Sequence, residues 1–363
     1  MERRGALPSQ MIQGMMEAGQ ITGAKTENIN PASLDLSLSD EVYRVDNLFQ
    51  PRPGEKVKNL IACEGKGAFR YSFDLPLERD VIYIAKLKEE LDLPEGIYGY
   101  CNPKSTTGRS DVFARVIADG VSRYDAAAPT GYKGALWISI IPQSFAVKFC
   151  VEDKLSQIRF FNANTRFDEL ELQLSMEKDK LLWSSEKKLR MSDLKITDRD
   201  GSIILTAMVS GRKIGWHSLR SNRVANFAGG NPIKRFFEKI NRNGGRIYPR
   251  KDEFYILSTR EAVMVPPWLA CEMVPMDERS GEFRSHYAGY IDPGWGFGSD
   301  GLGKGKTLTL EFRPFRDTVI RDGQPIAKIR FEKMIEVPRI HYDAMSSSNY
   351  IIQEGPRPAK IFA

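Results

Sequence analysis

A short run in the second half of the chain combines arginine, serine and backbone amide groups in a way that suits a phosphorylated substrate. The segment Arg279-Ser-Gly-Glu-Phe-Arg284 directly follows a strand-like run. Its Ser280 hydroxyl, two guanidinium groups and amides could converge on phosphate oxygens, which guanidinium binds with two parallel hydrogen bonds. The same residues would also suit an ordinary surface loop, so the segment alone leaves both interpretations open.

Two carboxylates follow. Asp292 begins the turn Asp292-Pro-Gly-Trp295, where it could simply satisfy its own turn backbone. In Thr307-Leu-Thr-Leu-Glu-Phe312 the apolar residues alternate onto one strand face, and Glu311 shares the other face with two threonines. A solvent-facing position would explain this glutamate. If the strand instead closed a pocket, burial would raise the pKa of Glu311, which suits a group that exchanges protons near neutral pH.

The same series of landmarks occurs twice, about 172 residues apart. Asp80-Val-Ile-Tyr-Ile-Ala85 in the first half matches Asp252-Glu-Phe-Tyr-Ile-Leu257 in the second. Each run leads through prolines to a serine, Ser105 or Ser280, and then to an arginine four residues later, Arg109 or Arg284. A turn, an apolar strand and an Ile-Arg-Phe strand follow in both. The sequence therefore predicts two tandem copies of one unit.

The elements that must position these residues are mostly short strands. Runs rich in β-forming residues and bounded by Gly, Pro, Asp and Asn recur in both copies, so each copy is predicted to be an all-β unit. Helices are expected at 10–18 and 167–183, and the run 232–240 is helix-like. We expect a first domain over 1–168, a helical linker over 169–195 and a second domain over 196–363.

The composition is that of a globular chain. Of 363 residues, 41% are hydrophobic and 28% are charged, and no apolar run approaches the roughly 20 residues that span a bilayer. The first residues lack an apolar signal core, so we expect a cytoplasmic protein. Four isolated cysteines predict packed, reduced thiols. The net charge of +6 is concentrated over 212–251, either as a solvated face or as a surface that attracts triphosphate or nucleic acid.

Together these motifs resemble the dCTP deaminase branch of the dUTPase-like family. Three occur in family order: Arg279-Ser-x-x-x-Arg284, Ala288-Gly-Tyr-Ile-Asp-Pro-Gly-Trp295 and Leu308-Thr-Leu-Glu-Phe312. Ile29-Asn-Pro-Ala-Ser-Leu-Asp-Leu36 is similar to the family's opening strand, and Tyr350-Ile-Ile-Gln-Glu-Gly-Pro356 to the tail that closes over the nucleotide. The resemblance implies a chain dominated by β structure, with two tandem dUTPase-like distorted β-barrel domains and a few short helices.

The resemblance also implies hydrolytic deamination of dCTP to dUTP and ammonia in pyrimidine deoxynucleotide metabolism. Glu311 matches the glutamate that activates water for attack at C4 and carries a proton to the leaving nitrogen. Ser280 and Arg284 match positions close to the reacting water. Gly281 stands where a second serine is usual and Asn349 where a lysine is usual, which bears on triphosphate affinity. The positions that match substrate-binding residues are Arg279 for phosphate, Ala288 for the base, Asp292 for the deoxyribose 3′-hydroxyl, and Tyr342, Tyr350 and Gln353 in the tail.

No tightly bound cofactor is expected. Zinc-dependent nucleobase deaminases hold their metal with His-x-Glu and Pro-Cys-x-x-Cys motifs, and the chain contains neither. We expect no zinc, and Mg²⁺ only as the ion that accompanies the triphosphate. Family sites lie between subunits of a trimer, so the resemblance implies a homo-oligomer with sites between domains or subunits. Neither a membrane nor a nucleic acid is expected as a partner.

The first copy retains only part of this site. Lys104, Ser105 and Arg109 resemble the phosphate motif, but Ser139 occupies the position of the catalytic glutamate, and a hydroxyl group cannot act as the required base. The Asp-Pro-Gly-Trp turn has become roughly Pro129-Thr-Gly-Tyr132. The first copy is therefore either structural or lends Lys104, Ser105 and Arg109 to a site that the second copy completes.

Two other functions remain open at this point. A dUTP diphosphatase activity, alone or as a second activity, would use the same fold and phosphate motif. That branch places its water-activating aspartate in a turn resembling Ile-Asp-x-Asp-Tyr, where this chain has Ile291-Asp-Pro-Gly-Trp295. A non-enzymatic nucleotide or nucleic-acid binder would use the basic segment 212–251, although the aromatic residues there are more typical of a core.

Overall fold

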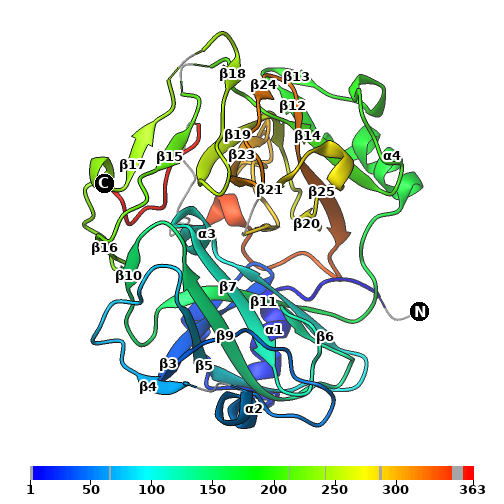
Figure 1. Ribbon diagram of the computed structural model, residues 1–363. Helices are drawn as coiled ribbons and strands as arrows, with labels where there is room; N and C mark the ends of the chain where they lie inside the picture. Colours follow the sequence, from blue (N-terminus) through cyan, green and yellow to red (C-terminus); the bar gives the residue numbers. More distant parts are fainter. Residues whose placement is uncertain (1–2, 65–66, 212, 242, 286–287, 346–354) are drawn as a thin grey trace. The chain divides into compact units, whose positions relative to one another are not determined.

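The computed structural model describes residues 3–64, 67–211, 213–241, 243–285, 288–345 and 355–363 (Figure 1). They form two compact units that interleave along the chain. The first-copy unit consists of Ser9–Ala163, Leu219–Phe236 and Ala359–Ala363, and the second-copy unit of Met1–Pro8, Asn164–Ser218 and Phe237–Pro358. The boundaries expected for the two copies, near 168 and 196, stay a prediction.

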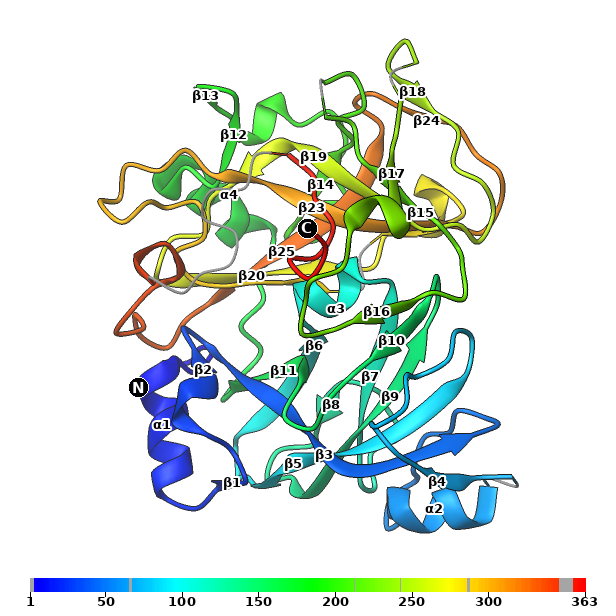
Figure 2. The same ribbon diagram turned by 90° about the vertical axis from the view of Figure 1, so that its left-hand side faces the viewer.

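The first-copy unit is built on one sheet of ten strands. Its elements before residue 164 are α1 (Ser9–Glu17), β1 (Ile21–Thr22), β2 (Ile29–Asn30), β3 (Ser33–Val45), α2 (Val57–Glu64), β4 (Phe69–Tyr71), β5 (Ile82–Asp92), β6 (Tyr98–Pro103), α3 (Ser105–Arg109), β7 (Val112–Ala118), β8 (Ala126–Ala127), β9 (Lys133–Pro142), β10 (Ala146–Lys148) and β11 (Lys154–Phe161). The main strands run in the order β7-β9-β5-β3-β11-β6-β8, and Figure 2 shows the long strand β3 crossing this unit. β3 joins the two parts of the sheet, because it pairs with β11 before a register shift at Leu38 to Val42 and with β5 around and after it.

Two segments from late in the sequence complete the first-copy unit. β16 (Val224–Asn226) pairs in parallel with β10. Near the C-terminus, Phe362 forms a parallel bridge with Asn231. The Phe362 ring lies 5.6 Å from the Phe145 ring and 5.3 Å from the Phe236 ring, centroid to centroid. The last residues of the chain are therefore fixed by an aromatic cluster within this unit.

In the second-copy unit the corresponding strand pairs are divided between two main sheets. Its elements are α4 (Glu169–Asp179), β12 (Leu182–Ser184), β13 (Lys187–Lys188), β14 (Ser202–Thr206), β15 (Trp216–Ser218), β17 (Phe237–Lys239), β18 (Arg246–Ile247), β19 (Tyr255–Val263), β20 (Leu269–Val274), β21 (Phe283–Ser285), β22 (Tyr290–Ile291), β23 (Lys306–Pro314), β24 (Ile320–Arg321) and β25 (Pro325–Lys333). One sheet runs β13-β12-β19-β15-β17, with β23 paired to β19 and β21; the other runs β14-β25-β20-β22. Where the first copy has the single strand β3, the second has β14 on one sheet and β15 on the other.

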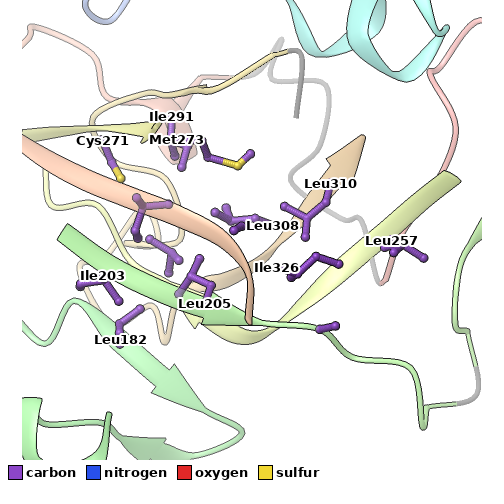
Figure 3. Packing of buried hydrophobic residues seen from close by; sticks show 14 of the residues in the cluster. Leu182, Ile203, Leu205, Leu257, Cys271, Met273, Ile291, Leu308, Leu310 and Ile326 are labelled. Atoms are coloured by element: carbon purple, nitrogen blue, oxygen red, sulfur yellow. The ribbon is translucent and has the colours of Figure 1, made fainter. Parts of the chain in front are cut away.

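The core of the second-copy unit lies between these sheets. Figure 3 shows Leu308 and Leu310 of β23 among Leu257, Ile326 and other apolar side chains. All four of these side chains are buried. Full burial of a Leu or Ile side chain stabilises the folded state by about 1.5–3 kcal/mol. Packing therefore fixes the apolar face of β23. Because side chains alternate along a strand, it also fixes the direction of Thr309 and Glu311 on the opposite face.

The predicted fold class is confirmed: the chain is mostly β, with barrel-like sheets and few helices. The helix expected at 10–18 is α1, and the one expected at 167–183 is the shorter α4, which begins at a capping box formed by Asp168 and Glu171. The helix-like run 232–240 is not an α-helix. It forms a 3-10 turn, Ile233–Arg235, and then strand β17, because pairing with β15 overrides its local pattern.

Two further findings concern the cysteines and the length of the helices. All four cysteines are free, but Cys63 and Cys150 are exposed, so only Cys101 and Cys271 are packed as expected. No helix in the described part of the chain is long and apolar enough to cross a membrane.

Candidate active site

Glu311 is buried on the face of β23 that alternation would leave to solvent. Leu308, Leu310 and Phe312 face the core, and Thr309 on the opposite face is half-buried. Glu311 shares that opposite face, yet only 1% of its surface is exposed. The predicted strand and its two faces are confirmed, whereas a solvent-facing glutamate is excluded. A carboxyl group held there has lost most of the water that would stabilise its charge.

The backbone of Ala288 meets this carboxyl group. The Ala288 amide donates to Glu311 Oε2, with an N to O distance of 3.4 Å. Ala288 is placed by the strand that follows it, since β22 pairs with β20 through Cys271 and Ile291. The Met273 amide also donates to the Gly289 carbonyl at 2.6 Å. The structure thus brings together two predicted site residues that stand 23 positions apart.

The Asp292 turn follows β22 directly and is closed by backbone bonds. The Trp295 amide donates to the Asp292 carbonyl at 3.2 Å, and the Val265 amide to the Trp295 carbonyl at 2.8 Å. Gly294 has a φ of 91°, in the left-handed region that favours glycine. A Cβ atom there would lie 2.5 Å from the His341 ring. Only glycine fits between the turn and the histidine.

Tyr342 is held against this turn. Its amide donates to the Pro293 carbonyl at 2.8 Å, and its ring centroid lies 5.2 Å from that of Trp295. The neighbouring Asp343 accepts from Lys306 Nζ at 2.6 Å. Sequence reasoning missed Lys306 and Asp343, because neither lies in a motif and their contact depends on the folded chain. The structure therefore places Tyr342 against the turn that Asp292 begins.

Arg279 and Ser280 lie in a 3-10 turn, Glu278–Ser280. The Arg279 side chain is 83% exposed, and both its Nε and its Nη2 donate to the Asp277 carboxylate at 2.8 Å. This guanidinium holds the pKa of Asp277 well below its usual range. The Ser280 amide donates to the Asp277 carbonyl at 2.9 Å. A phosphate that bound Arg279 would have to compete with Asp277, which lies outside the Arg279–Arg284 motif.

Arg284 lies on β21, on the same sheet face as Glu311. It pairs with Arg313 of β23, and paired residues of antiparallel strands point to the same face. Arg313 and Glu311 are two residues apart on one strand, so they also share a face. The structure thus brings Arg284 to the same sheet face as Glu311. Its partner Arg313 lies two residues, or about 7 Å, along β23 from Glu311.

In the first copy, Ser139 occupies the equivalent position. Ser139 pairs with Ile84 of β5, as Glu311 pairs with Ile256 of β19. Ser139 is fully buried, and its hydroxyl donates to the Arg115 carbonyl at 3.3 Å. The group that replaces the glutamate is therefore engaged with the backbone.

Strand register also identifies the first-copy counterpart of Asp292. Gly99 pairs with Ala127 as Cys271 pairs with Ile291. The residue after this pair is Asp292 in the second copy and Ala128 in the first. The first copy therefore lacks both carboxylates.

The phosphate-like residues of the first copy have a different local structure. Ser105 and Arg109 lie in helix α3, where Arg109 is only 5% exposed. Lys104 precedes the helix and forms an ion pair with Asp35. Arg109 is not the equivalent of Arg284: the first-copy residue in that strand register is Phe113, which pairs with Ile141 as Arg284 pairs with Arg313.

Two predicted site residues, Tyr350 and Gln353, lie outside the described residues. Across the part of the chain that the structure describes, no three His, Cys, Asp or Glu side chains group so as to hold a metal ion. Zinc independence and the accompanying Mg²⁺ stay predictions.

Comparison with known proteins places this geometry in a family. Residues 3–164 match the N-terminal domain, and residues 171–362 the C-terminal domain, of 2′-deoxycytidine 5′-triphosphate deaminase. The crystal structure of 2′-deoxycytidine 5′-triphosphate deaminase from Agrobacterium tumefaciens is similar, with a TM-score of 0.83 and 32% identity over 93% of this chain and 100% of that one. No curated protein sequence matches. The chain belongs to the 2′-deoxycytidine 5′-triphosphate deaminase family.

Proposed function

We propose that this protein hydrolyses the 4-amino group of dCTP to give dUTP and ammonia, in pyrimidine deoxynucleotide metabolism. The observation that carries the proposal is the buried Glu311 carboxyl group with the Ala288 amide directed at it. Membership of the deaminase family and the similarity to the Agrobacterium enzyme support it.

In the proposed mechanism Glu311 acts first as a base and then as an acid. Its carboxylate takes a proton from water while the water oxygen bonds to C4 of cytosine and the electrons of the C4–N3 double bond move to N3. The protonated carboxyl group then delivers that proton to the 4-amino nitrogen, the bond between C4 and this nitrogen breaks, the C4–N3 double bond re-forms and ammonia leaves. Movement of the remaining hydroxyl proton to N3 gives uracil. Burial of Glu311 keeps bulk solvent away from the carboxyl group during these proton transfers. The Ala288 amide restricts the orientation of the carboxyl group through Oε2.

The remaining site residues would bind substrate. Asp292, at the turn beside Tyr342, would accept a hydrogen bond from the 3′-hydroxyl, and Arg279 would exchange Asp277 for the triphosphate. Ser280 and Arg284 would lie close to the reacting water. Tyr350 and Gln353 in the tail, and Mg²⁺ with the nucleotide, belong to the same proposal, which requires no zinc.

The assembly is also part of the proposal. We propose a homo-oligomer in which sites form between domains or subunits, with Lys104, Ser105 and Arg109 either structural or lent to a site. Light scattering of the purified protein tests the oligomer, and an active monomer would contradict it.

Product analysis tests the reaction. The purified protein is incubated separately with dCTP and dUTP in the presence of Mg²⁺, nucleotides are separated by ion exchange, and ammonia is measured. Equal amounts of dUTP and ammonia from dCTP are expected. Release of pyrophosphate from dUTP would show a diphosphatase activity. If dCTP also gave dUTP and ammonia, this activity would be a second one; if it did not, it would replace the proposed deamination. Nucleotide binding without turnover would replace the proposal with a binding function.

A further inference from the structure

Four paired residues form one row across the larger sheet of the second-copy unit. Lys239 of β17 pairs with Trp216 of β15, Trp216 pairs with Ile256 of β19, and Ile256 pairs with Glu311 of β23. Paired residues of antiparallel strands point to the same face. Trp216 therefore lies on the Glu311 face, two strand spacings away, at about 10 Å.

Trp216 holds the backbone of the C-terminal segment. Its indole Nε1 donates to the Pro356 carbonyl, with an N to O distance of 3.1 Å. Gly355, which has a φ of 75°, lies beside Lys213, since a Cβ atom at 355 would be 3.5 Å from the Lys213 Cβ. Residues 355 and 356 thus contact both the start of β15 and the chain just before it.

The position of the Trp216 indole is itself fixed. The preceding Gly215 runs so close to β19 that a Cβ atom there would lie 2.3 Å from the Ile256 carbonyl oxygen. The Ile240 amide donates to the Gly215 carbonyl at 3.1 Å. Lys239 Nζ lies 5.6 Å from the centre of the indole ring. The indole N–H is therefore presented from a defined place on the sheet.

We infer that Trp216 is a positioning residue for dCTP: it fixes residues 355 and 356 on the Glu311 face and so sets how the C-terminal segment contributes to substrate affinity. The inference rests on the proposed function. Trp216 acts through Pro356 and takes no part in proton transfer at C4. Its loss should therefore raise KM and leave kcat nearly unchanged.

The test compares two tryptophans that make the same kind of bond. Trp183 also donates its indole N–H to a backbone carbonyl, that of Lys180, at 2.9 Å. Trp183 pairs with Ala262 of β19, and Ala262 pairs with Thr307, which lies four residues along β23 from Glu311, or about 13 Å from the row that contains Glu311. Trp183→Phe is therefore a matched control for Trp216→Phe.

Steady-state kinetics with dCTP give the first measurement. For Trp216→Phe we expect about a five-fold rise in KM, the effect of one neutral hydrogen bond, with kcat within two-fold. Trp183→Phe should change neither constant. Gly355→Ala, which strains a left-handed residue, should also raise KM. Unchanged KM in both Trp216→Phe and Gly355→Ala, or an equal effect of Trp183→Phe, would overturn the inference.

Hydrogen exchange gives a second measurement that does not depend on turnover. The amides of Gly355 and Arg357, the two residues of 355–358 that carry an amide hydrogen, should exchange faster in Trp216→Phe than in the wild type or in Trp183→Phe. Equal exchange in all three would also overturn the inference. Failure of the wild type to deaminate dCTP would instead count against the proposed function, so the two failures are distinguishable.

Discussion

The two copies use the same strand pairing to hold different side chains at two decisive positions. β5 and β9 pair as β19 and β23 do, and the residue opposite the isoleucine is Ser139 in the first copy and Glu311 in the second. Both side chains are buried. The first copy bonds its hydroxyl to a strand carbonyl, whereas the second directs the Ala288 amide at a carboxyl group. The first copy thus keeps the strand pairing of the second but not its carboxyl group.

The copies also differ in the turn after β8 and β22. An equivalent hydrogen bond closes both turns. The Val265 amide donates to the carbonyl of Trp295 in the second copy, and the Leu93 amide donates to the carbonyl of Tyr132 in the first. Within that shared frame the second copy has a carboxylate at its start and the first has Ala128. The turn therefore keeps its backbone geometry in both copies, whereas the Asp292 carboxylate is present only in the second.

The strongest test of this comparison is Glu311→Gln. An amide of the same size cannot exchange a proton as the proposed base does, so we expect kcat for dCTP to fall by about 1,000-fold. Circular dichroism should show a folded protein. Ser139→Ala is the matched control in the first copy and should leave kcat within two-fold. Substantial activity in Glu311→Gln would contradict the assigned role.

A second test substitutes the equivalent glycines of the two turns. Gly294 and Gly131 both have positive φ, 91° and 76°. A Cβ atom at 294 would lie 2.5 Å from the His341 ring, whereas the nearest atom to one at 131 is 3.8 Å away. We expect Gly294→Ala to lower the free energy of unfolding by about 3 kcal/mol and Gly131→Ala by about 1 kcal/mol.

Urea denaturation measures this difference. Gly294→Ala should in addition raise the KM for dCTP, because the displaced His341 precedes Tyr342, which binds the turn through the Pro293 carbonyl. Equal destabilisation by both substitutions would mean that backbone strain alone, and not the contact with His341, makes glycine necessary at 294.

The repeat offset allowed much of the fold to be predicted, because the paired strands β5 and β9 and their counterparts keep their spacing in both copies. It could not align Arg109 with its true counterpart. The first copy forms a helix where the second forms a short 3-10 turn, so a four-residue spacing ends on a helix in one and on a strand in the other. Local spacing does not determine that choice.

The site was predictable as far as local patterns extend. Strand alternation placed Glu311 on the correct face, but its burial depends on segments far away in the sequence, such as the one that carries Ala288. Asp277 and Trp216 were missed for a related reason. The first matters because it holds Arg279, and the second because it holds Pro356, and both contacts exist only in the folded chain.

The smallest expected effect concerns a glutamate that both copies share. Glu89 and Glu261 each accept a hydrogen bond from a backbone amide, that of Ser37 on β3 at 2.9 Å and that of Thr206 on β14 at 2.8 Å. Only Glu89 is fully buried, and burial raises its pKa from 4.5 to about 7. Between these values the folded state binds more protons than the unfolded state, so stability falls as pH rises through this window. Glu89→Gln should remove that fall and be more stable than the wild type above pH 7 by on the order of 2 kcal/mol. Urea denaturation from pH 4.5 to 8 measures it, with the partly exposed Glu261→Gln as control. A wild-type profile that Glu89→Gln leaves unchanged would show that Glu89 carries its charge in the fold as readily as in the unfolded chain.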